Sequence, residues 1–258
     1  MPDFRLRSVS HVHKGPVPVQ TLQDVDLHVR DGEFVCLLGA SGCGKSTLLD
    51  ILAGLLAPTG GVAEYAGAPI QGPDPARGLV FQDPALFPWR TLLQNVALGP
   101  ELRGESRRAC AAAALDALGR VGLERFASAY PHQLSGGMRQ RAGIARALAN
   151  QPRALLMDEP FGAVDHLTRV ALQEELLELW QRERQTVVFV THDVGEAVFL
   201  GDRVVLLSPR PGRIRCIVDV PAPRARVRGQ ADLLKIEAHI YALLHDSPST
   251  ERLEPAVV

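Results

Sequence analysis

The sequence has few of the features that mark secreted proteins, proteins stabilised by a structural metal, or membrane-spanning proteins. Its four cysteines form no CxxC pair, which argues against a disulfide framework or a zinc site and favours scattered reduced thiols. The longest apolar runs, such as Ala154–Met157 and Thr186–Val190, are far shorter than the ~20 residues that a membrane-spanning helix needs. The amino-terminal residues also lack the basic start and apolar run of a secretory signal. We therefore expect a soluble, cytosolic chain.

An excess of charge of one sign is absent as well. The chain has 28 Lys and Arg against 29 Asp and Glu, a formal net charge of −1. This balance gives no electrostatic basis for binding nucleic acid, so we expect no nucleic-acid partner. With 46% hydrophobic and 22% charged residues, the composition is globular rather than disordered. The 258 residues correspond to between one and two domains at ~150 residues each.

Strand and helix patterns alternate along the chain. Asp24–Arg30 alternates apolar and polar residues, as a half-buried strand does, and Glu33–Leu38 suits a strand buried on both faces. Other strands are predicted within Val62–Gln82 and at Ala154–Met157, Thr186–Val190 and Arg203–Leu207; helices are predicted at Lys45–Ala53, Glu105–Val121, Gly136–Asn150 and Thr168–Arg184. The alternation predicts an α/β fold with a mostly parallel sheet, interrupted by a helical insertion at roughly 88–151.

The last part of the chain has a different character. Pro221–Gln230 is predicted to be a basic linker, whose Arg224, Arg226 and Arg228 either touch lipid headgroups or lie in a solvated loop. We favour the solvated loop. Ala231–Leu244 predicts a weak helix, followed by a loosely held tail at His245–Val258. We therefore divide the chain into a domain at 1–220 and an extension at 221–258.

The strongest motif lies between a predicted strand and a predicted helix. It fits G-x-x-x-x-G-K-[ST] and consists of Gly39, Ala40, Ser41, Gly42, Cys43, Gly44, Lys45, Ser46 and Thr47. Glycines let successive backbone N–H groups turn inward around phosphate oxygens, and the helix that follows points its positive end at the same anion. Lys45 is expected to bind the β- and γ-phosphates and Ser46 to ligate Mg²⁺. A glycine-rich turn with a surface lysine is the less favoured interpretation.

Two acids follow the apolar strand at Ala154–Met157. Ligands bind at the carboxyl edge of open α/β sheets, where Asp158 and Glu159 would lie. Asp158 is expected to hold Mg²⁺, and Glu159 to orient or deprotonate an attacking water. A strand-end turn that merely exposes two acids is the alternative, which the phosphate loop makes less favoured.

The segment Leu134–Met138 resembles the signature motif of ATP-binding cassette (ABC) ATPases, usually LSGGQ. Other elements stand in the order of that family: Gln82 matches the Q-loop, Asp165 the D-loop and His192 the switch histidine. The resemblance covers about residues 4–220. It implies the P-loop NTPase fold of an ABC ATPase, with a mostly parallel core sheet, an N-terminal antiparallel β subdomain and an inserted helical subdomain.

The resemblance also assigns roles within a head-to-tail homodimer that encloses two ATP molecules. Ser135, Gly136 and Gly137 would bind the γ-phosphate held by the other subunit, because a helix start has free backbone N–H groups. Gln82 would contact Mg²⁺ and the attacking water, and His192 the γ-phosphate. Asp165 would cap its helix and communicate between the two sites. Met138 stands where the family usually has glutamine, and we expect a modest effect.

Two positions in the nucleotide site are open to two interpretations. The family usually stacks an aromatic residue on adenine, but Val9–His13 has none. His13 is the closest match, and it would either stack weakly or be an exposed histidine. Cys43 is either inert or, with its pKa lowered by the helix start, a site of alkylation that ATP protects.

The segments Phe81–Thr91 and Leu206–Ile214 resemble the importer branch that serves taurine, alkanesulfonates and nitrate. That resemblance implies an ATP-hydrolysing subunit at the cytoplasmic face of the inner membrane. Its partners would be a membrane permease and, indirectly, an extracytoplasmic solute-binding protein, with taurine the first choice of solute. Phe87, Pro88 and Trp89 suit a docking surface; subdomain core is the alternative for Phe87 and, less favoured, for Trp89. The alternatives are an exporter-type ATPase and a non-transport ABC ATPase in a nucleic-acid or ribosome complex.

Overall fold

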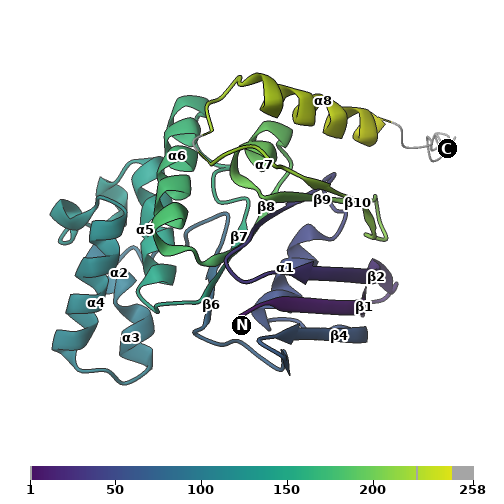
Figure 1. Cartoon of the computed structure of the whole chain (residues 1–258). Helices are drawn as coiled ribbons and strands as arrows, with labels where there is room; N and C mark the ends of the chain where they lie inside the picture. Colours follow the sequence, from purple (N-terminus) through teal and green to yellow (C-terminus); the bar gives the residue numbers. More distant parts are fainter. Residues whose placement is uncertain (1, 225, 246–258) are drawn as a thin grey trace, which may run out of the picture.

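The computed structural model describes residues 2–224 and 226–245, in which two sheets and two groups of helices are arranged as Figure 1 shows. A four-stranded antiparallel sheet has the order β2-β1-β4-β5, with β1 at Phe4–His13, β2 at Val19–Val29, β4 at Gly60–Tyr65 and β5 at Ala68–Pro69. A six-stranded sheet has the order β10-β9-β3-β8-β7-β6, with β3 at Phe34–Leu38, β6 at Arg77–Val80, β7 at Ala154–Asp158, β8 at Thr186–Thr191, β9 at Arg203–Leu207 and β10 at Ile214–Asp219.

The larger sheet is parallel except for its β10 edge, and both of its faces are covered. Helix α1 (Lys45–Ala53) contacts the large sheet and also β2 and β4 of the small one, so it lies between the two sheets. The opposite face is covered by α5 (Gly136–Leu148), α6 (His166–Glu183) and α7 (Val194–Leu200). Successive side chains of β3 enter different hydrophobic clusters, Phe34 on one face and Val35 on the other. This burial on both faces explains the nearly continuous apolar runs.

The insertion between β6 and β7 is helical, as the sequence predicts. It contains α2 (Leu92–Val96), α3 (Leu98–Leu102), α4 (Arg107–Arg120) and α5, with 3₁₀ turns at Glu124–Phe126 and Pro131–Gln133. Helices α2 and α4 begin at side-chain caps, Thr91 and Ser106. The parallel sheet, the antiparallel sheet and this helical insertion confirm the predicted fold class.

Several elements were not predicted individually from the sequence, among them β1, β10 and α7. Strand β1 contains register shifts, including one between Leu6 and Val9, so its apolar residues do not keep a spacing of two. Strand β10 is an edge strand with half-exposed apolar residues, which gives only a weak signal. Helix α7 has seven residues and is almost entirely buried, so it shows no polar face. Strand β2 also begins earlier than predicted, at Val19.

Two arginines of the predicted basic linker, Arg224 and Arg226, pack against the protein, so for them the solvated-loop interpretation is wrong, whereas Arg228 is exposed. Arg226 is 7% exposed and donates to the carbonyls of Val198, Phe199 and Gly201 at 2.8–2.9 Å. Arg224 lies 4.2 Å from the centre of the Trp180 ring, and Arg228 lies 4.1 Å from that of Phe199. The last carbonyls of a helix lack intrahelical partners, and Arg226 supplies donors to them at the end of α7. We call Arg224, Arg226 and Arg228 the arginine strap.

The predicted weak helix is present as α8 (Ala231–His245), which packs on α7 along the upper edge of Figure 1. Leu233 and Ile240 are buried in the same hydrophobic cluster as the large sheet. The predicted tail, apart from His245, lies outside the described residues. None of the helices in residues 2–224 and 226–245 combines the length and apolarity needed to cross a bilayer.

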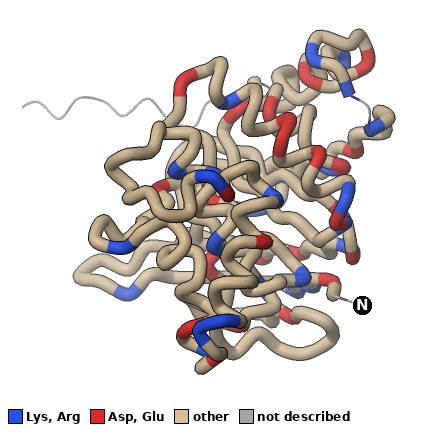
Figure 2. Tube along the Cα trace, turned by 90° about the vertical axis from the view of Figure 1, so that its left-hand side faces the viewer, with Lys and Arg blue, Asp and Glu red and all other residues tan. Residues whose placement is uncertain are grey.

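Charged positions are mixed in sign along the trace, with Lys and Arg interspersed among Asp and Glu in Figure 2. One buried pair lies at the amino-terminal edge of the large sheet. Glu33, immediately before β3, is 8% exposed and accepts from Arg203 at 3.0 Å and from the Arg30 backbone N–H at 2.8 Å. This acid lies at the edge opposite the carboxyl ends of the parallel strands.

Candidate active site

The loop Gly39–Thr47 joins β3 to α1, as the motif predicts. Gly44 has φ +102°, and a Cβ there would lie 2.7 Å from the Thr21 carbonyl oxygen, so only glycine fits. No side chain caps the start of α1. The first N–H groups of α1 and its positive dipole end are therefore directed into this loop, which is the arrangement that binds phosphate.

Lys45 lies inside the loop rather than on the surface. Its side chain is buried, and its ammonium donates to the carbonyls of Gly39 at 2.8 Å and Ala40 at 3.1 Å. These contacts hold a point charge against the loop, where a phosphate would meet it. The interpretation as a glycine-rich turn with a surface lysine is therefore wrong.

Ser46 and Asp158 come together from different elements. The Ser46 hydroxyl at the start of α1 hydrogen-bonds to the Asp158 carboxylate at the end of β7. Burial raises the pKa of Asp158, and that hydrogen bond and Lys45 oppose the shift. A hydroxyl and a carboxylate are hard oxygen ligands of the kind that Mg²⁺ takes together with substrate phosphates. The donor set present therefore fits Mg²⁺.

Glu159 and His192 also meet at this edge. Glu159 Oε2 lies 3.0 Å from His192 Nδ1, and the Glu159 backbone N–H donates to Val190 at 3.1 Å. Glu159 has φ +41°, which a residue with a side chain rarely adopts and which costs free energy. Backbone strain of this kind is common at functional sites. Lys45, Ser46, Asp158, Glu159 and His192 thus form one cluster at the carboxyl edge of the parallel strands.

The Q-loop is fixed by the helix that follows the signature segment. Gln140 Nε2 donates to the Gln82 carbonyl at 2.7 Å, and Arg146 donates to the carbonyls of Pro84 at 2.5 Å and Ala85 at 2.9 Å. Sequence reasoning assigned no role to Gln140 or Arg146. The available signal was a polar residue among the buried alanines of an amphipathic helix.

The signature segment forms the start of α5. Ser135 caps this helix by accepting the Met138 N–H at 3.2 Å. A Cβ on Gly137 would lie 2.7 Å from Thr168 Cγ2, so glycine permits α5 to approach the start of α6. Asp165 caps α6 by accepting the Thr168 N–H at 3.0 Å. The cap that the sequence suggested for Asp165 is therefore present, and Met138 packs half-buried against the core.

The signature segment and the phosphate loop belong to different parts of the surface. A cavity of about 560 Å³ adjoins the signature segment and is lined by residues of the Q-loop, the D-loop and α5, including Gln82, Gly136 and Val164. Among the described residues that line it, none belongs to Gly39–Thr47. Within one chain, the signature helix therefore adjoins the Q-loop and D-loop.

His13 and Cys43 have different outcomes. His13 is exposed, and its ring packs edge-on against the His11 ring at 4.7 Å between centres. Burial raises the pKa of Asp50 on α1, and nearby His13 opposes that shift. Cys43 is buried, and burial raises the pKa of its thiol. The expected lowering of the Cys43 pKa by the helix start is therefore wrong, because desolvation of the thiolate outweighs the nearby positive charge.

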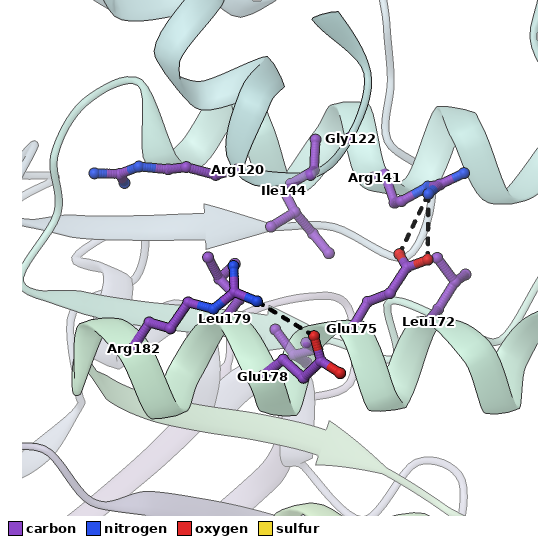
Figure 3. Close-up of a pocket in the computed structure, with 11 residues that line it drawn as sticks. Arg120, Gly122, Arg141, Ile144, Leu172, Glu175, Glu178, Leu179 and Arg182 are labelled. Atoms are coloured by element: carbon purple, nitrogen blue, oxygen red, sulfur yellow. Dashed lines mark hydrogen bonds and ion pairs between the residues drawn. The ribbon is translucent and has the colours of Figure 1, made fainter.

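A second cavity, of about 200 Å³, lies between the end of α4, α5 and α6 (Figure 3). Ile144 and Leu172 contribute apolar lining, and charged side chains surround it. Arg141 pairs with Glu175 at 3.3 Å, and Arg182 pairs with Glu178 at 3.4 Å. None of the predicted site residues lines this cavity.

Comparison with known proteins gives consistent matches. A sequence profile described as ABC transporter matches residues 22–162. An uncharacterized ABC transporter ATP-binding protein of Methanocaldococcus jannaschii is 50% identical over 88% of this chain and 85% of its own length. The taurine import ATP-binding protein TauB of Rhizobium johnstonii is 46% identical, over 92% of this chain and 93% of its own length. The nitrate import ATP-binding protein NrtD of a Synechocystis strain is 49% identical, over 80% of this chain and 77% of its own length.

Solved structures agree with the sequence matches. A dimeric ATP-binding cassette in a post-hydrolysis state, bound to ADP and Pi, is similar with a TM-score of 0.74 and 35% identity, covering 85% of this chain and 100% of that one. The phosphate loop and the acidic sheet edge provide the matching chemistry in this chain. The chain therefore belongs to the ABC transporter family of ATP-binding proteins, and it is an ATPase that couples ATP hydrolysis to transport.

Proposed function

We propose that this chain is the ATP-hydrolysing subunit of an importer for a small anionic or zwitterionic solute, with taurine the first choice and alkanesulfonate or nitrate next. The cluster that joins Lys45, Ser46, Asp158, Glu159 and His192 carries the ATPase part of the proposal. The import part is supported by the relatives whose names specify taurine or nitrate import. The solute itself would be selected by other polypeptides.

The positions of the side chains support the following catalytic roles. Lys45 would bind phosphate oxygens, and Ser46 and Asp158 would hold Mg²⁺, which neutralises phosphate charge when bound. Glu159 would accept a proton from the attacking water, and its hydrogen bond to His192 at 3.0 Å would fix the carboxylate in place. Gln82, on the loop tied to α5, would contact Mg²⁺ and the attacking water.

Hydrolysis would require a second copy of the chain. The start of α5, with Ser135, Gly136 and Gly137, would meet the γ-phosphate bound by the partner subunit's phosphate loop. A dimeric arrangement is supported by the similar cassette that was solved as a dimer with ADP and Pi. Asp165, at the start of α6, would connect the two sites.

A groove beside the Q-loop suits a permease helix. It has a volume of about 480 Å³ and lies between the end of α1, β6 and α3. Three of its apolar side chains are unusually exposed: Leu55 at 51%, Phe81 at 45% and Leu102 at 79%. Trp89 is 70% exposed nearby in sequence and packs on the half-buried Phe87 at 5.3 Å. Binding there would hold the chain at the cytoplasmic face of the inner membrane.

The test is uptake of labelled taurine by the source cells, comparing the natural chain with a chromosomal Glu159→Gln replacement. Unlabelled alkanesulfonate and nitrate serve as competitors. Loss of uptake in the variant, with competition by taurine alone, would support both the import role and the solute. Unchanged uptake in the variant would contradict taurine as the obligatory cargo. Competition by nitrate or sulfonate would reassign the solute and leave the import role standing.

A further inference from the structure

A buried acid outside the catalytic cluster lies four residues after His192 in the sequence. Glu196, on α7, is 6% exposed. Its carboxylate accepts from Gln173 Nε2 at 2.6 Å and from the Thr191 hydroxyl. Its own backbone N–H donates to the Asp193 carboxylate at 2.8 Å, which caps α7. A buried carboxylate with two side-chain donors is held firmly in one orientation.

The Thr191 hydroxyl links this carboxylate to the turn that bears His192. Thr191 ends β8, and its hydroxyl donates to Glu196 while accepting the Asp193 backbone N–H at 3.0 Å. The Thr191 hydroxyl therefore joins both neighbours of His192, because it belongs to Thr191 and accepts from the Asp193 backbone. Its hydrogen bond to Glu196 anchors this turn. The His192 side chain itself is 61% exposed, so few packing contacts hold it, and its place opposite Glu159 depends on this turn.

Gln173, which donates to Glu196, is itself held by Arg228 of the arginine strap. The Arg228 guanidinium donates to Gln173 Oε1 and lies over the Phe199 ring. Gln173, on α6, must direct its amide oxygen to Arg228 and its nitrogen to Glu196. The chain of hydrogen bonds therefore has one polarity, from Arg228 through Gln173 to Glu196.

We propose that Glu196 is a positioning residue for ATP hydrolysis, which holds the turn of His192 through the Thr191 hydroxyl while Gln173 and Arg228 fix its carboxylate. This inference rests on the proposed role of His192. It connects the arginine strap, at the start of the C-terminal extension, with the catalytic edge of the sheet. A purely structural role would lower the folded fraction and leave the turnover of the folded enzyme unchanged.

The test measures ATP hydrolysis by the purified full-length chain with Mg²⁺. Glu196→Gln places an amide nitrogen against the Gln173 nitrogen or the Thr191 hydroxyl, both donors, so the turn loosens. We expect kcat to fall on the order of tenfold, because misplaced catalytic groups are costly, with little change in KM.

A double variant, Glu196→Gln with Gln173→Glu, exchanges the two side chains and gives every donor an acceptor again. The carboxylate introduced at position 173 would accept from Arg228 and from the amide introduced at position 196. The oxygen of that amide would remain free to accept from the Thr191 hydroxyl. The double variant should therefore recover most of kcat.

Glu33→Gln is the matched control, because it neutralises a buried acid at the opposite edge of the sheet. It should lower stability without lowering kcat. In a His192→Ala background, Glu196→Gln should have no further effect on kcat, since the two act through one group. If Glu196→Gln fails to fold, Arg228→Met, at an exposed residue, should lower kcat in the same direction.

The outcomes distinguish failure of the positioning role of Glu196 from failure of the proposed role of His192. A His192→Ala variant with full activity would overturn the proposed role of His192 and this inference with it. A His192→Ala variant with low activity beside an unaffected Glu196→Gln or Arg228→Met variant would overturn this inference alone. Failure of the Gln173→Glu exchange to recover kcat in a folded double variant would also overturn it.

Discussion

Glu159 Oε2 and His192 Nδ1 are 3.0 Å apart, although 33 positions separate the two residues in the sequence. Each follows the carboxyl end of its strand, and the two strands, β7 and β8, are paired in parallel with Asp158 opposite Val190. Neighbouring parallel strands thus deliver the two side chains to one edge. The contact gives the Glu159 carboxylate a partner at this edge of the sheet.

Replacing Glu159 by Gln should lower the kcat of ATP hydrolysis at least about a hundredfold, because an amide cannot accept the proton of the attacking water. Nucleotide binding should persist, since Lys45 and Ser46 are unchanged. We expect the variant to form dimers with ATP and Mg²⁺ that are detectable by size-exclusion chromatography with light scattering. Monomers under these conditions would contradict the proposed dimer. The ADP-bound variant is the control.

Gly137→Ala should impair hydrolysis, because its Cβ would lie 2.7 Å from Thr168 Cγ2 and push α5 from α6. We expect a fall of roughly tenfold in kcat, as for other small misplacements of a site. The double variant with Thr168→Ser removes the obstructing methyl group and keeps the hydroxyl. Its kcat should return toward that of the natural chain. No recovery would show that glycine is needed there for another reason.

Cys43 should react slowly with N-ethylmaleimide. Burial raises the pKa of this thiol, so less thiolate is present at pH 7 than in an ordinary cysteine. We expect native Cys43 to be labelled at least about tenfold more slowly than in urea, and faster as the pH rises. Mass spectrometry of the Cys43 peptide measures the rate. Equal rates in the native and denatured protein would show an open, reactive thiol.

Arg226→Met should destabilise the fold by roughly 2–4 kcal/mol, because several buried carbonyls lose their donor at once. Burial lowers the pKa of Arg226 to about 10, which still leaves it charged at neutral pH. Urea unfolding followed by circular dichroism measures the free energy. Arg182→Met, whose side chain is 73% exposed, is the matched control and should change stability by about 0.5 kcal/mol or less. An equal loss of unfolding free energy in both variants would show that Arg226 stabilises the fold no more than an exposed arginine does.

Leu102→Asp should weaken binding to the permease, because it places a charge in the exposed apolar groove beside the Q-loop. The side chain is 79% exposed, so folding and ATP binding should be unaffected. We expect co-purification with the permease to fall severalfold, as for loss of an interface anchor. Leu234→Asp, an equally simple change at a half-exposed position on α8, is the control. Equal capture of Leu102→Asp and the natural chain would argue against this groove.

Much of the site could be predicted because its signals are local. The phosphate loop is nine consecutive residues whose glycines and lysine have few other uses. Asp158 and Glu159 stand next to an apolar strand, and strand ends meet at one edge in any parallel sheet. The strand β1 was missed because its register shifts break the alternation on which strand prediction depends.

Other interactions joined residues that the sequence keeps apart. Gln140 contacts Gln82 across 58 positions, and nothing in either local pattern indicates the other. The arginine strap has alternating arginines, which on a linear chain are typical of a solvated segment. Only the folded chain brings carbonyls from the end of α7 within reach of Arg226.

By itself, the sequence determined the α/β fold, the phosphate loop and the acids at the sheet edge, because each depends on neighbours within a few residues. The tertiary structure alone decided the raised pKa of Cys43, the partners of Arg226 and the placement of Glu196 behind His192. Burial and long-range hydrogen bonds set these properties. Both depend on which distant segments exclude water from a side chain, and no local pattern contains that information.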